Sequence, residues 1–206
     1  IGRLGNWLFQ YASSYAIAEK SNHRLVIAKR HELRNFFKGL TAREDAGFEG
    51  AEHKELQSMI YTPGLQSLTG NVTLCCYLQS WKYFEGFEDK VRQEFTFKDA
   101  IRMRATKQLN DCQSRYIEKF DATPVFVGVH VRRRDVISRV AKRNGFVAAP
   151  ASYLKRAMTF YSNRYHHVVF VLASDDHRWC STLLSKEISD GTVCMPETRS
   201  AGEDLC

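Results

Sequence analysis

Val125-Phe-Val-Gly-Val-His-Val-Arg-Arg-Arg-Asp135 is the part of the sequence that determines the fold class. Its first five residues form a continuous apolar run, which predicts a β-strand that is buried on both faces. The polarity then reverses within a few residues to a histidine, three arginines and an aspartate. A buried strand of this kind is typical of a parallel sheet in an α/β protein, where the carboxyl ends of the strands face the ligand crevice.

The charged residues that follow this run favour a phosphate-bearing ligand. Guanidinium groups are permanently charged and planar, and each can bind two phosphate oxygens at once. Because side chains alternate along a strand, we expect His130 and Arg132 to share one face, while Val131 and Arg133 point the other way. Arg132 is therefore the first candidate for a phosphate clamp, with His130 as a donor or orienting group. The alternative interpretation is an ordinary buried strand that ends in a solvated basic loop.

The composition is that of a globular protein with an excess of basic residues. A length of 206 residues allows one large domain or two small ones, and 44% apolar residues are sufficient for a proper core. The net charge of +7 favours an anionic partner, which could be nucleic acid, a membrane surface or a phosphorylated ligand. Charge alone does not choose among these three.

The cysteines and one sequon bear on the cellular compartment. No Cys-x-x-Cys pair occurs, which argues against a zinc site and leaves disulfides open, although the sequence selects no pairing. Asn71-Val-Thr73 is an N-glycosylation sequon, which has meaning only in a secretory compartment and also occurs by chance. The six cysteines are Cys75, Cys76, Cys112, Cys180, Cys194 and Cys206.

The first residues predict a glycine turn followed by a helix. Residues 1–6, Ile-Gly-Arg-Leu-Gly-Asn, precede apolar residues at helical spacing, and residues 25–27 then read as a short buried strand. We expect Asn6 to cap the helix, and we expect the glycines to let the backbone approach a ligand, because a helix N-terminus presents free N–H groups to an anion. A plain tight turn is an equally good interpretation. Residues 31–70 are irregular, charged and rich in turns.

The remaining pattern predicts alternating helices and strands. A strand near residue 74 leads into an aromatic-rich turn, and helical spacing then runs through residues 87–120. After the basic cluster, a helix at 151–165, a second apolar strand at 168–173, a further helix and a third strand at 192–195 indicate a parallel α/β unit. The second strand ends in Ser174-Asp175-Asp176. We place Ser174 and Asp175 at the crevice, although these two residues are equally plausible helix N-caps.

Four stretches of the sequence resemble one family of enzymes. His130-Val-Arg-Arg-Arg-Asp135 is similar to the His-x-Arg-Arg-x-Asp signature of inverting α1,2- and α1,6-fucosyltransferases. Residues 2–12, GRLGNWLFQYA, and residues 76–84, CYLQSWKYF, resemble two further motifs that narrow the likeness to galactoside α1,2-fucosyltransferases. The fourth stretch runs from Ser174 to Trp179. The sequence departs from the family at Trp7, where a polar residue is more usual, and at Cys76, which replaces a glycine.

The resemblance implies a fold and a reaction. It implies a GT-B-like α/β architecture with two Rossmann-type domains, an acceptor-side domain at 1–120 and a donor-binding domain at 121–206. The implied reaction moves L-fucose from GDP-fucose to the 2-hydroxyl group of a terminal galactose, with inversion and without a cofactor or metal. No Asp-x-Asp motif occurs in the sequence, in agreement with this.

The resemblance also assigns roles to residues of this chain. The catalytic candidates are Arg132, Asp135 and His130, and the acceptor-binding candidates are Gln79, Trp81 and Tyr83. The donor-binding candidates are Arg133, Gly2, Arg3, Gly5, Asn6, Ser174, Asp175 and Asp176. The galactose hydroxyl needs a proton acceptor, for which Asp135, Asp175 and Asp176 all qualify, although Asp135 could instead hold the arginine cluster.

The same resemblance implies a location in the Golgi, with Asn71 glycosylated and the full-length protein anchored in the membrane as a type II protein. We therefore expect the chain to be a fragment that lacks an N-terminal anchor and a C-terminal motif. The expected partners are GDP-fucose and galactose-terminated glycans, and no nucleic acid. Two alternatives stay open, namely a protein O-fucosyltransferase-like enzyme and a non-catalytic module that binds heparin or nucleic acid.

Overall fold

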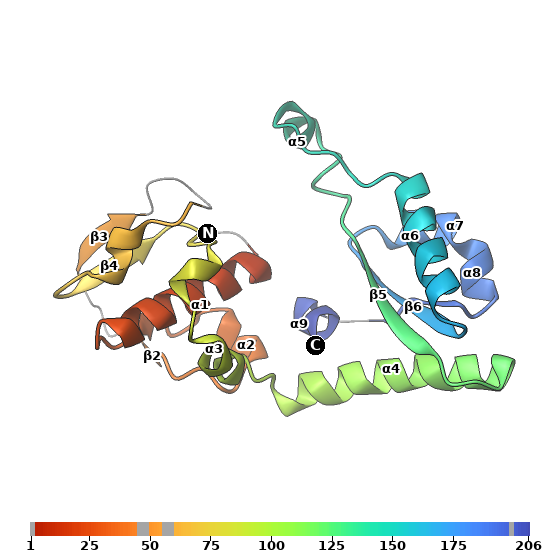
Figure 1. The fold of residues 1–206 in the computed structure, drawn as a ribbon, viewed down its shortest axis with the longest axis horizontal. Coiled ribbons are helices and arrows are strands. Elements are labelled where there is room, and N and C mark those ends of the chain that lie inside the picture. The colour runs from red at the N-terminus through yellow and green to blue at the C-terminus, as the bar shows by residue number, and fades with distance from the viewer. Residues whose placement is uncertain (1–2, 45–49, 55–59, 198–199) are drawn as a thin grey trace. The chain divides into compact units, whose positions relative to one another are not determined.

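A computed structural model describes residues 3–44, 50–54, 60–197 and 200–206 of the chain (Figure 1). The chain divides into two compact units, Ile1–Ile101 and Arg102–Cys206, and each is described by itself. Both units are of the α/β class with parallel strand pairs, as the sequence predicts. Within the described residues, no helix is both long and apolar enough to cross a lipid bilayer.

The first unit contains the long helix α1 (Leu4–Lys20), which buries one side of its surface. Its buried residues Ala12 and Ala16 lie four apart, so they share one face of the helix. The helix begins at Leu4 with Arg3 at the N-cap position, and no side chain caps it. The predicted cap by Asn6 is therefore wrong, because the helix begins two residues earlier and Asn6 lies within its first turn.

Short parallel strands accompany this helix. The predicted strand near residue 26 is β1 (Val26–Ile27), which pairs with β2 (Arg43–Glu44), and the predicted strand near residue 74 is β4 (Val72–Cys75), which pairs with β3 (Ala51–Lys54). The segment read as irregular contains only short elements, namely β2, β3, α2 (Leu33–Phe36) and η1 (Pro63–Gln66). The aromatic turn after β4 contains the 3-10 helix η2 (Trp81–Tyr83).

The helical pattern at 87–120 forms two helices, α3 (Glu88–Glu94) and α4 (Asp99–Phe120), and so the prediction of one helix is wrong. Residues 95–98 bind the segment at 36–38 instead of continuing the helix. The Lys98 amide donates to the Phe36 carbonyl at 2.9 Å, and the Lys38 amide donates to the Thr96 carbonyl at 2.8 Å. Aromatic contacts with Phe37 stabilise this break, since its ring centroid lies 4.8 Å from that of Phe97.

The second unit is built on a parallel sheet in the order β5 (Val125–Val131), β6 (Val168–Ser174) and β7 (Val193–Cys194). The helices α6 (Ala151–Arg164), α7 (His177–Leu183) and α8 (Ser185–Ser189) lie on one side of it (Figure 1). Leu154 and Met158 of α6 form a core there with Phe170 and Leu172. On the other side, α4 contributes Cys112 and Tyr116 to a cluster that contains Val169. The strand β6 is therefore buried on both faces.

The strand β5 is less buried than the sequence predicts. Val127, Val129 and Val131 pack against the core, but Val125 and Phe126 are 42% and 38% exposed, so the prediction of burial on both faces is wrong for this strand. Among the described strands, β5 pairs on one side only, with β6. A side chain built on Gly128 would meet no atom within 4 Å, which shows that the second face is open.

Two smaller helices and one disulfide complete the second unit. The helix α5 (Arg139–Arg143) lies in the loop after β5, and α9 (Ala201–Leu205) lies at the end of the described chain. Cys112 of α4 forms a disulfide with Cys194 of β7, which the sequence alone could not select. In the described part of the chain, the other cysteines are free.

Candidate functional site

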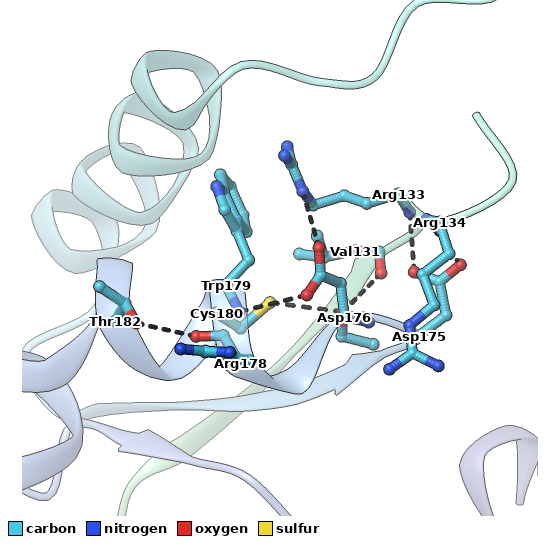
Figure 2. A network of polar contacts seen from close by, with 10 residues as sticks. Val131, Arg133, Arg134, Asp175, Asp176, Arg178, Trp179, Cys180 and Thr182 are labelled. Atoms are coloured by element: carbon cyan, nitrogen blue, oxygen red, sulfur yellow. Dashed lines mark hydrogen bonds and ion pairs between the residues drawn. The ribbon is translucent and has the colours of Figure 1, made fainter. Parts of the chain in front are cut away.

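The candidate site lies where the two central strands of the second unit end. The strands β5 and β6 are parallel neighbours, and their register places Val131 opposite Ser174. The segments at the ends of the two strands, 132–135 and 174–176, therefore meet at the same edge of the sheet, where Figure 2 shows Arg133 and Arg134 next to Asp175 and Asp176. The structure thus brings together the arginine cluster and the serine and aspartates that the sequence placed at the crevice.

Ser174 and Asp175 hold the backbone of the arginine loop. The Ser174 hydroxyl donates to the Val131 carbonyl at 2.8 Å. One carboxylate oxygen of Asp175 accepts from the Arg133 amide at 2.7 Å, and the other accepts from the Arg134 amide at 3.1 Å (Figure 2). Carboxylate bonds to main-chain amides are among the stronger hydrogen bonds, so Asp175 fixes the course of the chain directly after β5.

The Arg133 side chain is held between a carboxylate and an aromatic ring. Its Nε donates to Oδ2 of Asp176 at 3.3 Å, and its guanidinium carbon lies 3.8 Å from the centroid of the Trp179 ring (Figure 2). The side chain of Arg133 is only 17% exposed. A guanidinium that stacks on an indole and pairs with a carboxylate has little freedom, so Arg133 presents a fixed positive charge.

Asp176 has a second function, because it also caps α7. Its Oδ1 accepts from the Trp179 amide at 3.2 Å, and its own amide donates to the Ser174 hydroxyl at 2.9 Å. The Cys180 thiol donates to the same hydroxyl at 3.3 Å, and burial raises the pKa of this thiol. The predicted cap by Ser174 or Asp175 is therefore wrong, since Asp176 is the N-cap of α7, and this residue also pairs with Arg133.

Arg132 is held differently from Arg133. Its Nε donates to both carboxylate oxygens of Asp135, at 3.0 and 3.1 Å, and its Nη2 also bonds to this carboxylate. This hydrogen bonding raises the pKa of Arg132 further, so the group stays charged. Exposure alternates as expected, because His130 and Arg132 are exposed while Val131 and Arg133 are partly buried. Arg132 therefore lies on the open side of the loop, and Arg133 lies on the packed side.

The arrangement is suited to binding an anion. Two guanidinium groups follow each other in the sequence, and each is oriented by one carboxylate. A guanidinium carries five N–H donors, and a single carboxylate engages only some of them. Donors therefore remain for the oxygens of a ligand. All three aspartates proposed as proton acceptors already have hydrogen-bond partners in the arginine loop.

The first unit brings together a second set of predicted residues. Asn6 and Gln79 are directly bonded, since Nε2 of Gln79 donates to Oδ1 of Asn6 at 2.7 Å. Two further bonds tie α1 to the same segment, from Gln10 Nε2 to the Cys76 carbonyl at 2.7 Å and from the Ser13 hydroxyl to the Leu78 carbonyl at 2.8 Å. The segment at 76–79 is thus fixed along the N-terminal half of α1.

The other predicted residues of this unit lie in different environments. Trp81 is 56% exposed and can present its ring to a ligand, whereas Tyr83 is fully buried and its hydroxyl accepts from the Thr62 amide at 2.8 Å. The core position of Tyr83 is unsuited to direct contact with a sugar, so its predicted role in acceptor binding needs correction. Arg3 and Gly5 are exposed at the start of α1. Gly2 lies outside the described residues.

The sequence indicates Trp179 only as a helix marker and a match to the family, whereas the structure stacks its ring on Arg133 of the candidate site. Its stacking on Arg133 depends on a contact between β5 and α7. One feature of the sequence indicates this contact. Trp179 lies three residues after Asp176, in the first turn of the helix that follows β6. This place brings its ring to the same edge of the sheet as the arginine loop.

Comparison with known proteins gives a match over the whole chain. The family described as Glycosyl transferase family 11 matches residues 1–206. The chain is 30% identical over 184 residues to galactoside alpha-(1,2)-fucosyltransferase 1 of Sus scrofa, covering 87% of this chain and 50% of that protein. It is 29% identical over 196 residues to the protein of the same name from Homo sapiens, covering 93% of this chain and 53% of that protein.

A third relative has a related name. The chain is 29% identical over 199 residues to galactoside alpha-(1,2)-fucosyltransferase 2 of Pongo pygmaeus, covering 92% of this chain and 56% of that protein. The chain therefore spans about half the length of the curated relatives that it matches. No solved structure gives a significant match to it.

Proposed function

The chain belongs to glycosyl transferase family 11, and on this premise we propose that its protein is a galactoside α1,2-fucosyltransferase. The proposed reaction moves L-fucose from GDP-fucose to the 2-hydroxyl group of a terminal galactose, with inversion at the anomeric carbon. The names of the relatives support the transfer of fucose to galactosides. The observation that carries the proposal is the pair of oriented guanidinium groups, Arg132 and Arg133, at the carboxyl ends of two parallel strands.

The proposed architecture is GT-B-like, with an acceptor-side Rossmann-type domain at 1–120 and a donor-binding one at 121–206. The parallel pairs in both units support this proposal, as does the position of the arginine cluster at the carboxyl edge of the larger sheet. Diphosphate ligands bind at this edge in open α/β sheets. GDP-fucose is accordingly assigned to the loops after β5 and β6, and the galactoside to the side of Gln79 and Trp81.

The proposed chemistry depends on charge at the leaving group. As the bond from fucose C1 to the diphosphate breaks, the sugar becomes oxocarbenium-like and negative charge builds up on GDP. Preorganised cationic donors stabilise such charge without reorganising during the reaction. Arg133 is held between Asp176 and Trp179, and Arg132 is held by Asp135, so both groups are oriented in advance. In this proposal the arginines take the place of a divalent metal, and Asp135 is a positioning residue for Arg132.

A binding experiment on the full-length protein tests the donor. Titration calorimetry with GDP, UDP and CMP should give the tightest binding for GDP, and GDP-fucose with a panel of galactosides should yield an α1,2-linked product. A preference for UDP would end the fucosyltransferase proposal. Binding of heparin with a steep dependence on salt, and with no preference among the nucleotides, would instead support the polyanion-binding module.

The proposed compartment is the Golgi lumen, with the full-length protein anchored in the membrane as a type II protein. Asn71 is exposed directly before β4, where an oligosaccharyltransferase could reach it. For protein secreted from eukaryotic cells, treatment with an N-glycosidase should increase the mobility on a gel. Asn71→Gln should remove this change, and an unchanged mobility of the wild-type protein would contradict the proposed glycosylation.

A further inference from the structure

Two adjacent cysteines lie where β4 ends. The Sγ atoms of Cys75 and Cys76 are 3.1 Å apart, and the Cys76 thiol donates a hydrogen bond to Cys75. Both residues are partly exposed and neither belongs to the disulfide between Cys112 and Cys194. Two thiols at this distance are placed to react with each other, and small reagents can reach them from solvent.

The backbone explains this proximity. Adjacent side chains of a regular strand point to opposite faces, which would separate the two sulfur atoms. The strand ends at Cys75, and Cys76 has a φ of 83°, in the left-handed region that residues other than glycine rarely adopt. This turn brings the Cys76 side chain next to that of Cys75. The position is also the one where the resembled motif has a glycine, so the dithiol is a particular feature of this chain.

The neighbouring strand β3 places charged residues beside Cys75. Lys54 of β3 lies opposite Cys75 in the register, and its ammonium group is 3.3 Å from the Glu52 carboxylate. The hydrogen bond with Cys76 raises the pKa of Cys75 to about 11, with further contributions from burial and from a bond to Glu52. Cys75 therefore stays protonated near neutral pH.

We propose that Cys75 and Cys76 form an oxidation site, at which a small-molecule disulfide such as oxidised glutathione converts the two thiols into a disulfide between adjacent residues. One of the two thiols loses its proton and attacks one glutathione sulfur, which forms a mixed disulfide and releases the first reduced glutathione. The other thiol then loses its proton, attacks the protein sulfur of the mixed disulfide and releases the second one. The protein loses two protons and two electrons, and one glutathione disulfide becomes two thiols.

The second step is favoured by the proximity of the two thiols. The two sulfur atoms already lie 3.1 Å apart before the reaction. The second thiol is therefore placed to attack the mixed disulfide, in competition with free glutathione. The modification is independent of the proposed transferase reaction, since none of its steps uses the arginine cluster.

The oxidised site should change the contacts of α1. The Cys76 carbonyl accepts from Gln10, and Gln79, three residues further on, donates to Asn6. Joining the two sulfur atoms requires the backbone at 75–76 to move, which weakens these bonds. Hydrogen exchange of the amides in the first two turns of α1 should therefore become faster on oxidation, while exchange in α6 should stay unchanged.

Peptide mapping by mass spectrometry tests the proposal directly. The full 206-residue chain is reduced, treated with excess oxidised glutathione, quenched with acid, alkylated and digested without reductant. The peptide with both cysteines should be lighter by two hydrogen atoms and carry no alkyl group. The linked peptide of Cys112 and Cys194 should form in the same sample and shows that the protein is folded. Alkylation of both Cys75 and Cys76, retained glutathione, or a link to Cys180 or Cys206 would overturn the proposal.

Two matched variants test the participation of both thiols. In Cys75→Ser, the reaction should stop at the mixed disulfide, so one glutathione should remain on Cys76. In Cys76→Ser, the reaction should stop at the same stage, so one glutathione should remain on Cys75. A variant that retains no glutathione on its remaining thiol would contradict the proposal. Replacing Cys206, which is exposed, by Ser in both variants prevents dimers through this residue.

Discussion

Arg132 and Arg133 are neighbours in the sequence, yet different carboxylates hold their side chains. Arg132→Ala should lower kcat on the order of 100- to 1000-fold in the full-length enzyme, because a donor to the developing charge of the leaving group is lost. Arg132→Lys should also fail substantially, since it keeps the charge but loses the planar fork that Asp135 orients. The measurement is kcat and the donor KM with GDP-fucose.

Arg134 provides the matched control for this experiment. Its amide donates to Asp175, which Arg134→Ala preserves, and its side chain is exposed. This variant should therefore keep most of the activity. Near-normal turnover of Arg132→Ala, with the fold intact by circular dichroism, would remove Arg132 from the proposed mechanism.

A second prediction at this scale concerns the backbone at Cys76. Its φ of 83° is strained for any residue with a Cβ atom, so Cys76→Gly should stabilise the protein by about 1 kcal/mol. Cys75→Gly is the control, because Cys75 ends a strand and has no positive φ; it should instead destabilise by about 0.5–1 kcal/mol. Urea denaturation under reducing conditions measures both. A shift of both midpoints in the same direction would contradict the account of strain at Cys76.

The residue types of the arginine site could be predicted from the sequence, but their individual partners could not. The charge reversal after an apolar run indicates an anion site at a strand end, and alternation places Arg132 and Arg133 on different sides. The stacking of Arg133 on Trp179 requires knowledge of how α7 leaves β6, which no local pattern contains. The burial of Tyr83 was missed for the same reason, because its hydroxyl is satisfied by the amide of Thr62, distant in the sequence.

At the scale of secondary structure elements, Asp176 links a helix start to the crevice. Asp176→Ala should destabilise the second unit by about 1–2 kcal/mol, because the N-cap of α7 is lost. Asp176→Asn should keep most of this stability, since asparagine is an equally good N-cap. Both variants lose the charge that pairs with Arg133, so both should weaken GDP binding in the full-length protein. Equal stability losses for Ala and Asn, measured by urea denaturation, would show that the cap contributes nothing.

The elements differ in how well the sequence predicts them. The strand β6 and the helix α6 follow closely from apolar runs and helical spacing, because each buries the surface that its pattern shows. The strand β5 has the same apolar run but an open face, and periodicity cannot tell an edge strand from a central one. The break between α3 and α4 was missed because it results from main-chain bonds to the segment at 36–38. Such long-range bonds override a local helical preference.

At the scale of the whole chain, the sequence is sufficient to predict the fold class but not which strands pair or which cysteines are bonded. Alternating helical and apolar segments indicate an α/β protein with parallel strands, and the two-unit division is compatible with the chain length. The pairing of β1 with β2 and of β3 with β4 joins strands of two to four residues, which have too little pattern to predict. The disulfide is a further connection of this kind, since it depends on how α4 crosses the sheet.

The prediction at the scale of the whole molecule concerns the contribution of the disulfide between Cys112 and Cys194 to stability. The bond closes a loop with a sequence separation of 82 residues between α4 and β7, and the loop contains β5, β6 and the whole arginine site. A covalent link over such a loop lowers the entropy of the unfolded chain and typically stabilises the folded state by about 2–4 kcal/mol. Reducing the bond should therefore lower the urea midpoint of the second unit by a corresponding amount. The first unit, which lies outside the loop, should not change.

The double variant Cys112→Ala/Cys194→Ala separates this effect from other effects of the reductant. Its midpoint should equal that of the reduced wild-type protein, apart from the packing lost with the two sulfur atoms, and it should not respond to reductant. Hydrogen exchange then locates the change, since amides of β6 should exchange faster in the reduced protein while those of α1 keep their rates. An unchanged wild-type midpoint on full reduction would mean that packing of Tyr116 and Val169 alone holds α4 on the sheet. In that case the bond would make no contribution to the stability of the second unit.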